Sequence, residues 1–146
     1  MTLPDVASGR FTQEKGFHIV LQVPETHVQI VIDAILDVAP LKQGDYDSVA
    51  FKTNTGLQQF RSLGTGRNPK SPGLINVPCL EVSYFQENDP AMINQVIEAI
   101  YDAHPYEEPV IRIQEALRTK HIPGVDEDNP NRIWNARDAD WYKPDG

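Results

Sequence analysis

The stretch FHIVLQVPETHVQIVIDAIL, residues 17–36, changes from a strand pattern to a helix pattern at a single proline. Apolar residues alternate over residues 17–23, which predicts a strand with one buried face. Pro24 ends this strand, and proline suits the first turn of a helix because the N–H group that it lacks has no partner there. Beyond it, apolar residues recur at helical spacing, namely Val28, Val31, Ile32, Ile35 and Ala39. The stretch therefore predicts a strand followed directly by an amphipathic helix that extends over residues 25–39.

The same kind of unit recurs later in the chain. Strand character returns in three segments, which are residues 44–53, 78–86 and 110–117. Residues 55–60 either pair with the first of these segments or form a loop. Asp89 and Pro90 give a second helix its N-cap and first turn, and Pro105 ends it. The order of elements predicts an α+β fold, a ferredoxin-like βαββαβ sandwich with a four-stranded antiparallel sheet and both helices on one face.

The second face of this sheet needs a cover. Ile111 and Ile113 are expected on the buried face of the last strand. Val49, Phe51 and Phe85 fall on the opposite side of their strands from the inward residues. These apolar side chains predict that a partner subunit covers the open face.

Composition and charge exclude several classes of protein. The chain has 146 residues, which suits one domain with its own core. A formal charge of −8 argues against a nucleic-acid-binding protein, which normally carries a basic surface. No stretch has the roughly 20 apolar residues of a membrane span, and residues 1–10 lack the pattern of a signal peptide. One cysteine, Cys79, cannot form an internal disulfide. We therefore expect a cytoplasmic protein with no membrane and no nucleic-acid partner.

The chain divides into three parts in this interpretation. Residues 1–16 form a flexible lead-in, residues 17–117 form the domain, and residues 118–146 form a C-terminal extension. The extension has no clear periodicity, but it carries Ile133, Trp134, Trp141 and Tyr142. Because aromatic side chains contribute much of the energy of contacts, we expect the two tryptophans to anchor the extension on the domain or on a neighbouring subunit.

Four segments together resemble a known family: FHIVLQVPETHVQIVIDAIL, GDYD, FRSLGTGRNP and AIYDAHPYEEPV. They look like the CutA/PII-like domain of YqfO-type proteins, the dinuclear-metal-centre family, over about residues 17–115. The resemblance implies a homotrimer that binds ligands in clefts between its subunits. The metal-centre domain that often surrounds this domain does not fit in 146 residues, so its hydrolytic chemistry is not expected. Similar domains often have a cysteine shortly after the tyrosine that Tyr46 matches, whereas Asp47 and Ser48 follow it here. Tyr46 remains a candidate ligand-binding residue.

The glycine-rich segment SLGTGRNPKSPG, residues 62–73, is a second candidate site. It nearly matches a phosphate-binding P-loop, but Pro69 stands where the second glycine belongs and removes a backbone N–H group. A nucleotide-hydrolysing P-loop is therefore excluded. Arg61, Arg67 and Lys70 are candidates to bind a small anionic ligand, as loops of PII-type proteins do. The alternative is a solvated loop whose charges only keep the protein soluble.

The motif AHPYEEP, residues 103–109, is the third candidate site. His104 closes a helix while Glu107 and Glu108 begin a strand, so the loop between them can turn the three side chains toward one point. An imidazole with carboxylates suits a divalent metal ion such as zinc or manganese. Water or a neighbouring subunit would have to complete the ligand shell. The alternative is structural, with His104 as a cation at the helix C-terminus and Glu108 starting the strand.

These features favour a non-catalytic binding or regulatory module over two alternatives. The first alternative is an interaction subunit that docks a partner through residues 118–146. The second is an enzyme that uses Glu107 or Glu108 as a general base beside His104. No nucleophile, oxyanion donor or cofactor motif accompanies these residues, and Cys79 lies in a predicted strand without a local base.

Overall fold

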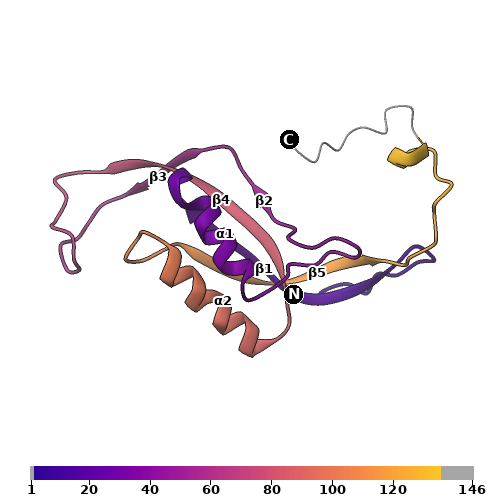
Figure 1. The fold of residues 1–146 in the computed structure, drawn as a ribbon. Helices are drawn as coiled ribbons and strands as arrows, with labels where there is room; N and C mark the ends of the chain where they lie inside the picture. The colour runs from indigo at the N-terminus through magenta and orange to yellow at the C-terminus, as the bar shows by residue number, and fades with distance from the viewer. Residues whose placement is uncertain (1, 136–146) are drawn as a thin grey trace.

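The computed structural model describes residues 2–135 of the chain. Its elements follow the order β1 (Phe11–Val23), η1 (Glu25–His27), α1 (Val28–Leu36), β2 (Phe51–Lys52), β3 (Gly56–Phe60), β4 (Ile75–Glu87), α2 (Pro90–Ala103), β5 (Ile111–His121) and η2 (Ile133–Asn135). The two α-helices lie side by side on one face of an antiparallel sheet (Figure 1). Trp141, one of the two tryptophans predicted as anchors, lies outside the described residues.

The sheet has five strands instead of the four predicted. Its order is β2-β4-β1-β5, and β3 also pairs with β4. The difference arises in the segment expected as one strand over residues 44–53, where Gly44 and Ser48 take positive φ angles of 59° and 58°. Such angles bend the backbone out of strand geometry. Pairing with β4 therefore begins only at Phe51, and β2 and β3 follow each other along the same side of β4.

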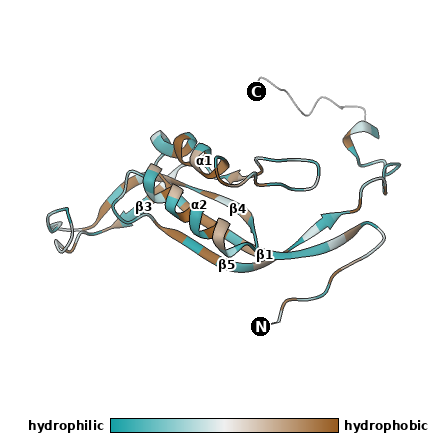
Figure 2. Ribbon diagram, turned by 60° about the horizontal axis from the view of Figure 1, so that its bottom comes forward, coloured by the Kyte–Doolittle hydropathy of each residue, from teal (hydrophilic) through white to brown (hydrophobic). Residues whose placement is uncertain are grey.

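The core lies between the sheet and the two helices. Ile19 and Leu21 of β1 are fully buried there, and Ile100 of α2 packs in the same cluster. All five residues of the apolar stripe predicted for the first helix are buried, although α1 itself ends at Leu36, before the last of them. Both helices carry apolar and polar residues in turn, as expected for helices with one buried face (Figure 2). The predicted cap is also confirmed, because the Asp89 carboxylate accepts a hydrogen bond of 3.2 Å from the Met92 N–H group.

Strands β1 and β5 reach beyond the predicted domain limits. Residues 11–16 were expected in the lead-in, yet they pair with β5, which itself continues past Leu117 to His121. Residues 11–16 lack the apolar alternation that marks a strand in the sequence. They form a strand because contacts with β5 stabilise them. Arg118 forms a 2.8 Å ion pair with Glu14 across the two strands, and its guanidinium lies 4.0 Å from the centre of the Phe85 ring.

The open face of the sheet is only partly as predicted. Val49 and Phe51 are exposed, with 41% and 68% of their surface accessible, whereas Phe85 is half-buried beneath Arg118.

The expectation that Ile113 is buried is wrong, since 47% of its surface is exposed. Ile113 pairs with the buried Ile19 of β1, but β5 is the edge strand of the sheet on that side. Ile111, the other residue expected on the buried face of β5, packs at the margin of the core.

β3 and the first residues of β4 form a two-stranded arm that projects from the body of the sheet (Figure 1). β1 pairs with β4 only as far as Leu80, so residues 75–79 have β3 as their one strand partner within the described chain. The arm, residues 56–79, holds the glycine-rich segment at its tip. Within residues 2–135, no helix combines the length and apolar character that crossing a membrane requires.

Candidate functional site

His104 of the AHPYEEP motif is a buried residue at the end of α2. The helix stops there because His104 adopts an extended backbone, while its N–H group still donates to the Ile100 carbonyl at 2.8 Å. In the ring, Nε2 lies 2.7 Å from the Gln22 carbonyl oxygen and Nδ1 lies 3.1 Å from the Tyr106 backbone nitrogen. The Tyr106 N–H group needs an acceptor, so the ring proton sits on Nε2 and is donated to Gln22.

The environment of His104 favours its neutral form. Burial lowers the pKa of His104 below its usual 6.5, and the nearby His27 acts in the same direction against the opposing hydrogen bond to Gln22. The alternative that His104 is a cation at the helix C-terminus is therefore not supported. The ring instead connects the end of α2 to the last residues of β1.

The structure does not assemble the predicted metal set of His104, Glu107 and Glu108. Both ring nitrogens of His104 already have partners within the chain. Among residues 2–135, no three or more histidine, cysteine or acidic side chains are grouped so that they could hold a metal ion. Sequence spacing alone did not reveal that the imidazole is used internally.

Glu107 instead contacts the glycine-rich loop. Its Oε1 atom accepts a hydrogen bond of 3.3 Å from the Arg67 N–H group, and a Cβ atom at Gly66 would collide with the same oxygen. The base of the loop is closed by Ser62 and Ser71, because the Ser71 N–H group donates to the Ser62 carbonyl at 3.0 Å and the Ser62 N–H group to Ser71 Oγ at 3.1 Å. Two segments about 40 residues apart in the chain thus meet at Glu107.

A cleft of about 700 Å³ lies between these two segments. We call it the loop cleft. Arg61, Glu107 and Glu108 line it, together with residues 64–66. Tyr106 also lines it, so the wall combines charged groups with an aromatic ring. This volume falls within the range of small-molecule sites in proteins.

The four residues predicted to bind a ligand do not all line the loop cleft. Arg61 lines the loop cleft, and Arg67 contributes its backbone N–H group to the contact with Glu107. Lys70 and Tyr46 do not line the cleft. Tyr46 lies in a turn with Gln43 and is 65% exposed.

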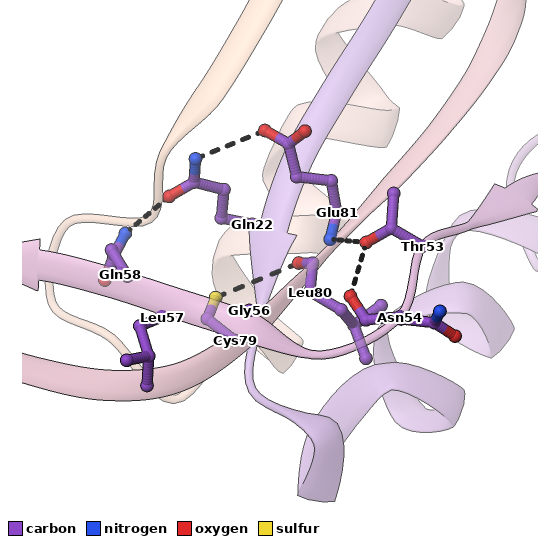
Figure 3. Close-up of a pocket in the computed structure, with 9 residues that line it drawn as sticks. All are labelled: Gln22, Thr53, Asn54, Gly56, Leu57, Gln58, Cys79, Leu80 and Glu81. Carbon is purple, nitrogen blue, oxygen red and sulfur yellow. Dashed lines mark hydrogen bonds between the residues drawn. The ribbon is translucent and has the colours of Figure 1, made fainter.

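A second, smaller cavity of about 250 Å³ lies at the base of the arm (Figure 3). We call it the amide pocket. Gln58 Nε2 donates to Gln22 Oε1 at 2.8 Å, and Gln22 Nε2 donates to Glu81 Oε2 at 3.2 Å. These residues belong to three strands, and no sequence motif marks them, because polar residues on an exposed strand face are common. Sequence reasoning missed this pocket for that reason.

Cys79 lies in the wall of the amide pocket and is buried. Burial is the main cause that raises the pKa of the Cys79 thiol. Burial also raises the pKa of Tyr106, followed by the neighbouring Cys79. A neutral thiol is a poor nucleophile. Tyr106 and Gln58 both line the loop cleft, and they touch Cys79 and Gln22 of the amide pocket, so the two cavities are neighbours.

Several solved structures have a fold similar to that of this chain. No protein-family model matches the sequence, and no curated protein matches it either. Among solved structures, a Bacillus cereus protein related to NIF3 is similar with a TM-score of 0.59 and 24% identity, over 74% of this chain. CutA from Xylella fastidiosa is similar with a TM-score of 0.51 and 12% identity, over 68% of this chain and 82% of that one.

The divalent ion tolerance protein CutA1 from Ehrlichia chaffeensis is similar with a TM-score of 0.52 and 10% identity, over 71% of this chain and 82% of that one. The fold is of the CutA type. The chain spans only 27% of the length of the NIF3-related protein. At these identities the likeness concerns the fold alone.

Proposed function

We propose that the protein is a non-catalytic binding module, a PII/CutA-like domain of the YqfO type that acts in the cytoplasm. Its ligand would be a small anion bound in the loop cleft together with a divalent cation. The observation that supports this most is the meeting of two distant segments around one cleft, with Glu107 in contact with Gly66 and Arg67.

The charges of the loop cleft support a cation and an anion bound together. Arg61 attracts an anion, and backbone N–H groups of a glycine-rich loop can bind one. Glu107 and Glu108 line the same cleft and repel a lone anion. A divalent cation between the carboxylates and the anion removes this repulsion, as magnesium does between carboxylates and phosphates. Because His104 is used internally, the available ligands are oxygen atoms, which favours manganese over zinc.

A non-catalytic role fits the state of the groups that an enzyme would use. His104 has both ring nitrogens in hydrogen bonds, so it is not available as a general base. Burial keeps the Cys79 thiol in its neutral form. The carboxylates of the loop cleft then serve to bind a ligand.

Calorimetric titration with pyrophosphate, in the presence and absence of Mn²⁺, tests the proposal. We expect saturable binding of pyrophosphate only when Mn²⁺ is present. Arg61→Ala should weaken this binding about tenfold, since it removes a charge-assisted hydrogen bond. Lys70→Ala removes the same charge outside the cleft and should have little effect. Binding of pyrophosphate that is unchanged by Mn²⁺, or equal effects of the two variants, would contradict the proposal.

We also propose that the module is a homotrimer. The arm exposes Leu57 and Leu63, with 70% and 65% of their surface accessible, and Phe51 beside it is 68% exposed. Exposed apolar side chains next to unpaired strand edges are typical of surfaces that associate. Sedimentation should therefore give about three times the chain mass of 16.4 kDa. A monomer at micromolar concentration would contradict this part of the proposal.

A second candidate function is docking of a partner through the C-terminal extension. Trp134 is 58% exposed, although its Nε1–H group donates to the Glu127 carbonyl at 2.9 Å. An exposed tryptophan is a frequent anchor in protein interfaces. Deleting residues 122–146, which follow β5, separates the candidates. Loss of the trimer would assign the extension to assembly, and an intact trimer would leave it for another partner.

A further inference from the structure

The amide pocket contains a carboxylate without a cationic partner. Glu81 is half-buried, and none of the ion pairs among residues 2–135 includes it. Its Oε2 atom accepts one hydrogen bond, from Gln22 Nε2, and its backbone N–H group donates to Thr53 Oγ1 at 2.9 Å. A carboxylate can accept about four hydrogen bonds, so most of its capacity is unused.

This carboxylate also orients the amides beside it. Because a carboxylate only accepts hydrogen bonds, the Nε2 group of Gln22 must face Glu81. The oxygen of Gln22 then faces Gln58, which donates its own Nε2 group. The hydrogen bonds from Gln58 to Gln22 and from Gln22 to Glu81 therefore run in one direction (Figure 3). Among the described residues, none donates a hydrogen bond to the Gln58 side-chain oxygen.

We propose that the amide pocket is a second ligand site, for a small organic cation that carries several N–H donors, such as a guanidinium or a primary ammonium group. The pocket offers a negative charge and a free amide oxygen, which match such a donor-rich cation. Its volume of about 250 Å³ suits a ligand smaller than a drug molecule. A metal ion fits less well, because Glu81 is the only acidic residue among the described residues that line the pocket.

NMR titration with methylguanidinium and methylammonium at millimolar concentration tests this site. We expect saturable shifts of the side-chain amide signals of Gln22 and Gln58. Tetramethylammonium carries the same charge but no N–H donor, and it should cause no such shifts. Glu81→Gln keeps the shape of the side chain and should weaken binding about tenfold or more. Glu115→Gln removes an equal charge from an exposed position on β5 and should leave binding unchanged.

Several results would overturn the proposal. Equal shifts with tetramethylammonium would mean attraction by charge alone, and unchanged binding in Glu81→Gln would remove the carboxylate from the site. If Glu81→Gln loses its folded spectrum, Gln58→Met tests the same pocket from the outer end of the amide chain, and unchanged binding there would count equally against the site. Arg61→Ala should not affect this binding, so failure here is distinguishable from failure of the loop cleft.

Discussion

Replacing Gly16 with alanine is expected to lower the free energy of unfolding by about 1–3 kcal/mol. Gly16 lies on β1, between its partners Glu87 on β4 and Ala116 on β5. A Cβ atom there would collide with the Phe85 ring and would lie 2.5 Å from the Gln86 carbonyl oxygen. The ring could shift, but the carbonyl belongs to the backbone of a paired strand, so the sheet itself must move.

Gly9→Ala is the matched control, because a Cβ atom at Gly9 meets nothing within 4 Å. Urea unfolding of both variants measures the difference. The Gly16 variant should also weaken the contact of Arg118 with Phe85, whose ring centre lies 4.0 Å from the guanidinium. Equal stability of the two variants would show that the strands tolerate a side chain at Gly16 and that the contact with Phe85 and Gln86 is not tight.

His104→Ala is expected to destabilise the protein by about 2–4 kcal/mol at neutral pH, through a cavity and a lost hydrogen bond to the Gln22 carbonyl. The effect should depend on pH. The folded state lowers the pKa of His104 below 6.5, so the unfolded chain binds a proton more readily. The stabilisation from His104 is then complete above pH 6.5 and is lost as the pH falls toward the folded-state pKa.

The stability difference between wild type and His104→Ala should therefore shrink as the pH is lowered from neutral to values below 6.5. His18→Ala, at an exposed position of β1, serves as the control. Thermal unfolding across this range provides the measurement. A difference that stays constant, or that grows at low pH, would mean that His104 is not held neutral by the fold.

The local sequence predicted the elements that are marked by a periodic apolar pattern or by a helix cap. The alternation around Ile19 and the apolar stripe of α1 reflect contact with one core, and Asp89 followed by Pro90 marks the start of α2. The beginning of β1 was missed because its stability comes from pairing with β5, including the contact of Glu14 with Arg118. No local pattern contains that information.

The candidate site was also predicted only in part from the sequence. The sequence singled out AHPYEEP and the glycine-rich loop separately, and the fold brings Glu107 to Gly66. The sequence could not show that both ring nitrogens of His104 have partners within the chain, because these partners are backbone groups. Gln22 and Glu81 were missed altogether, since their contact joins residues 59 positions apart.

Paramagnetic broadening by Mn²⁺, added with pyrophosphate to the isotope-labelled protein, tests the location of the loop cleft most directly. Bound Mn²⁺ broadens the NMR signals of nearby nuclei. We expect broadening of the backbone amide signals in both residues 61–68 and residues 106–110, while the signals of the turn around Tyr46 stay sharp. Broadening confined to one of the two segments, or centred elsewhere on the chain, would contradict the claim that they form one ligand site.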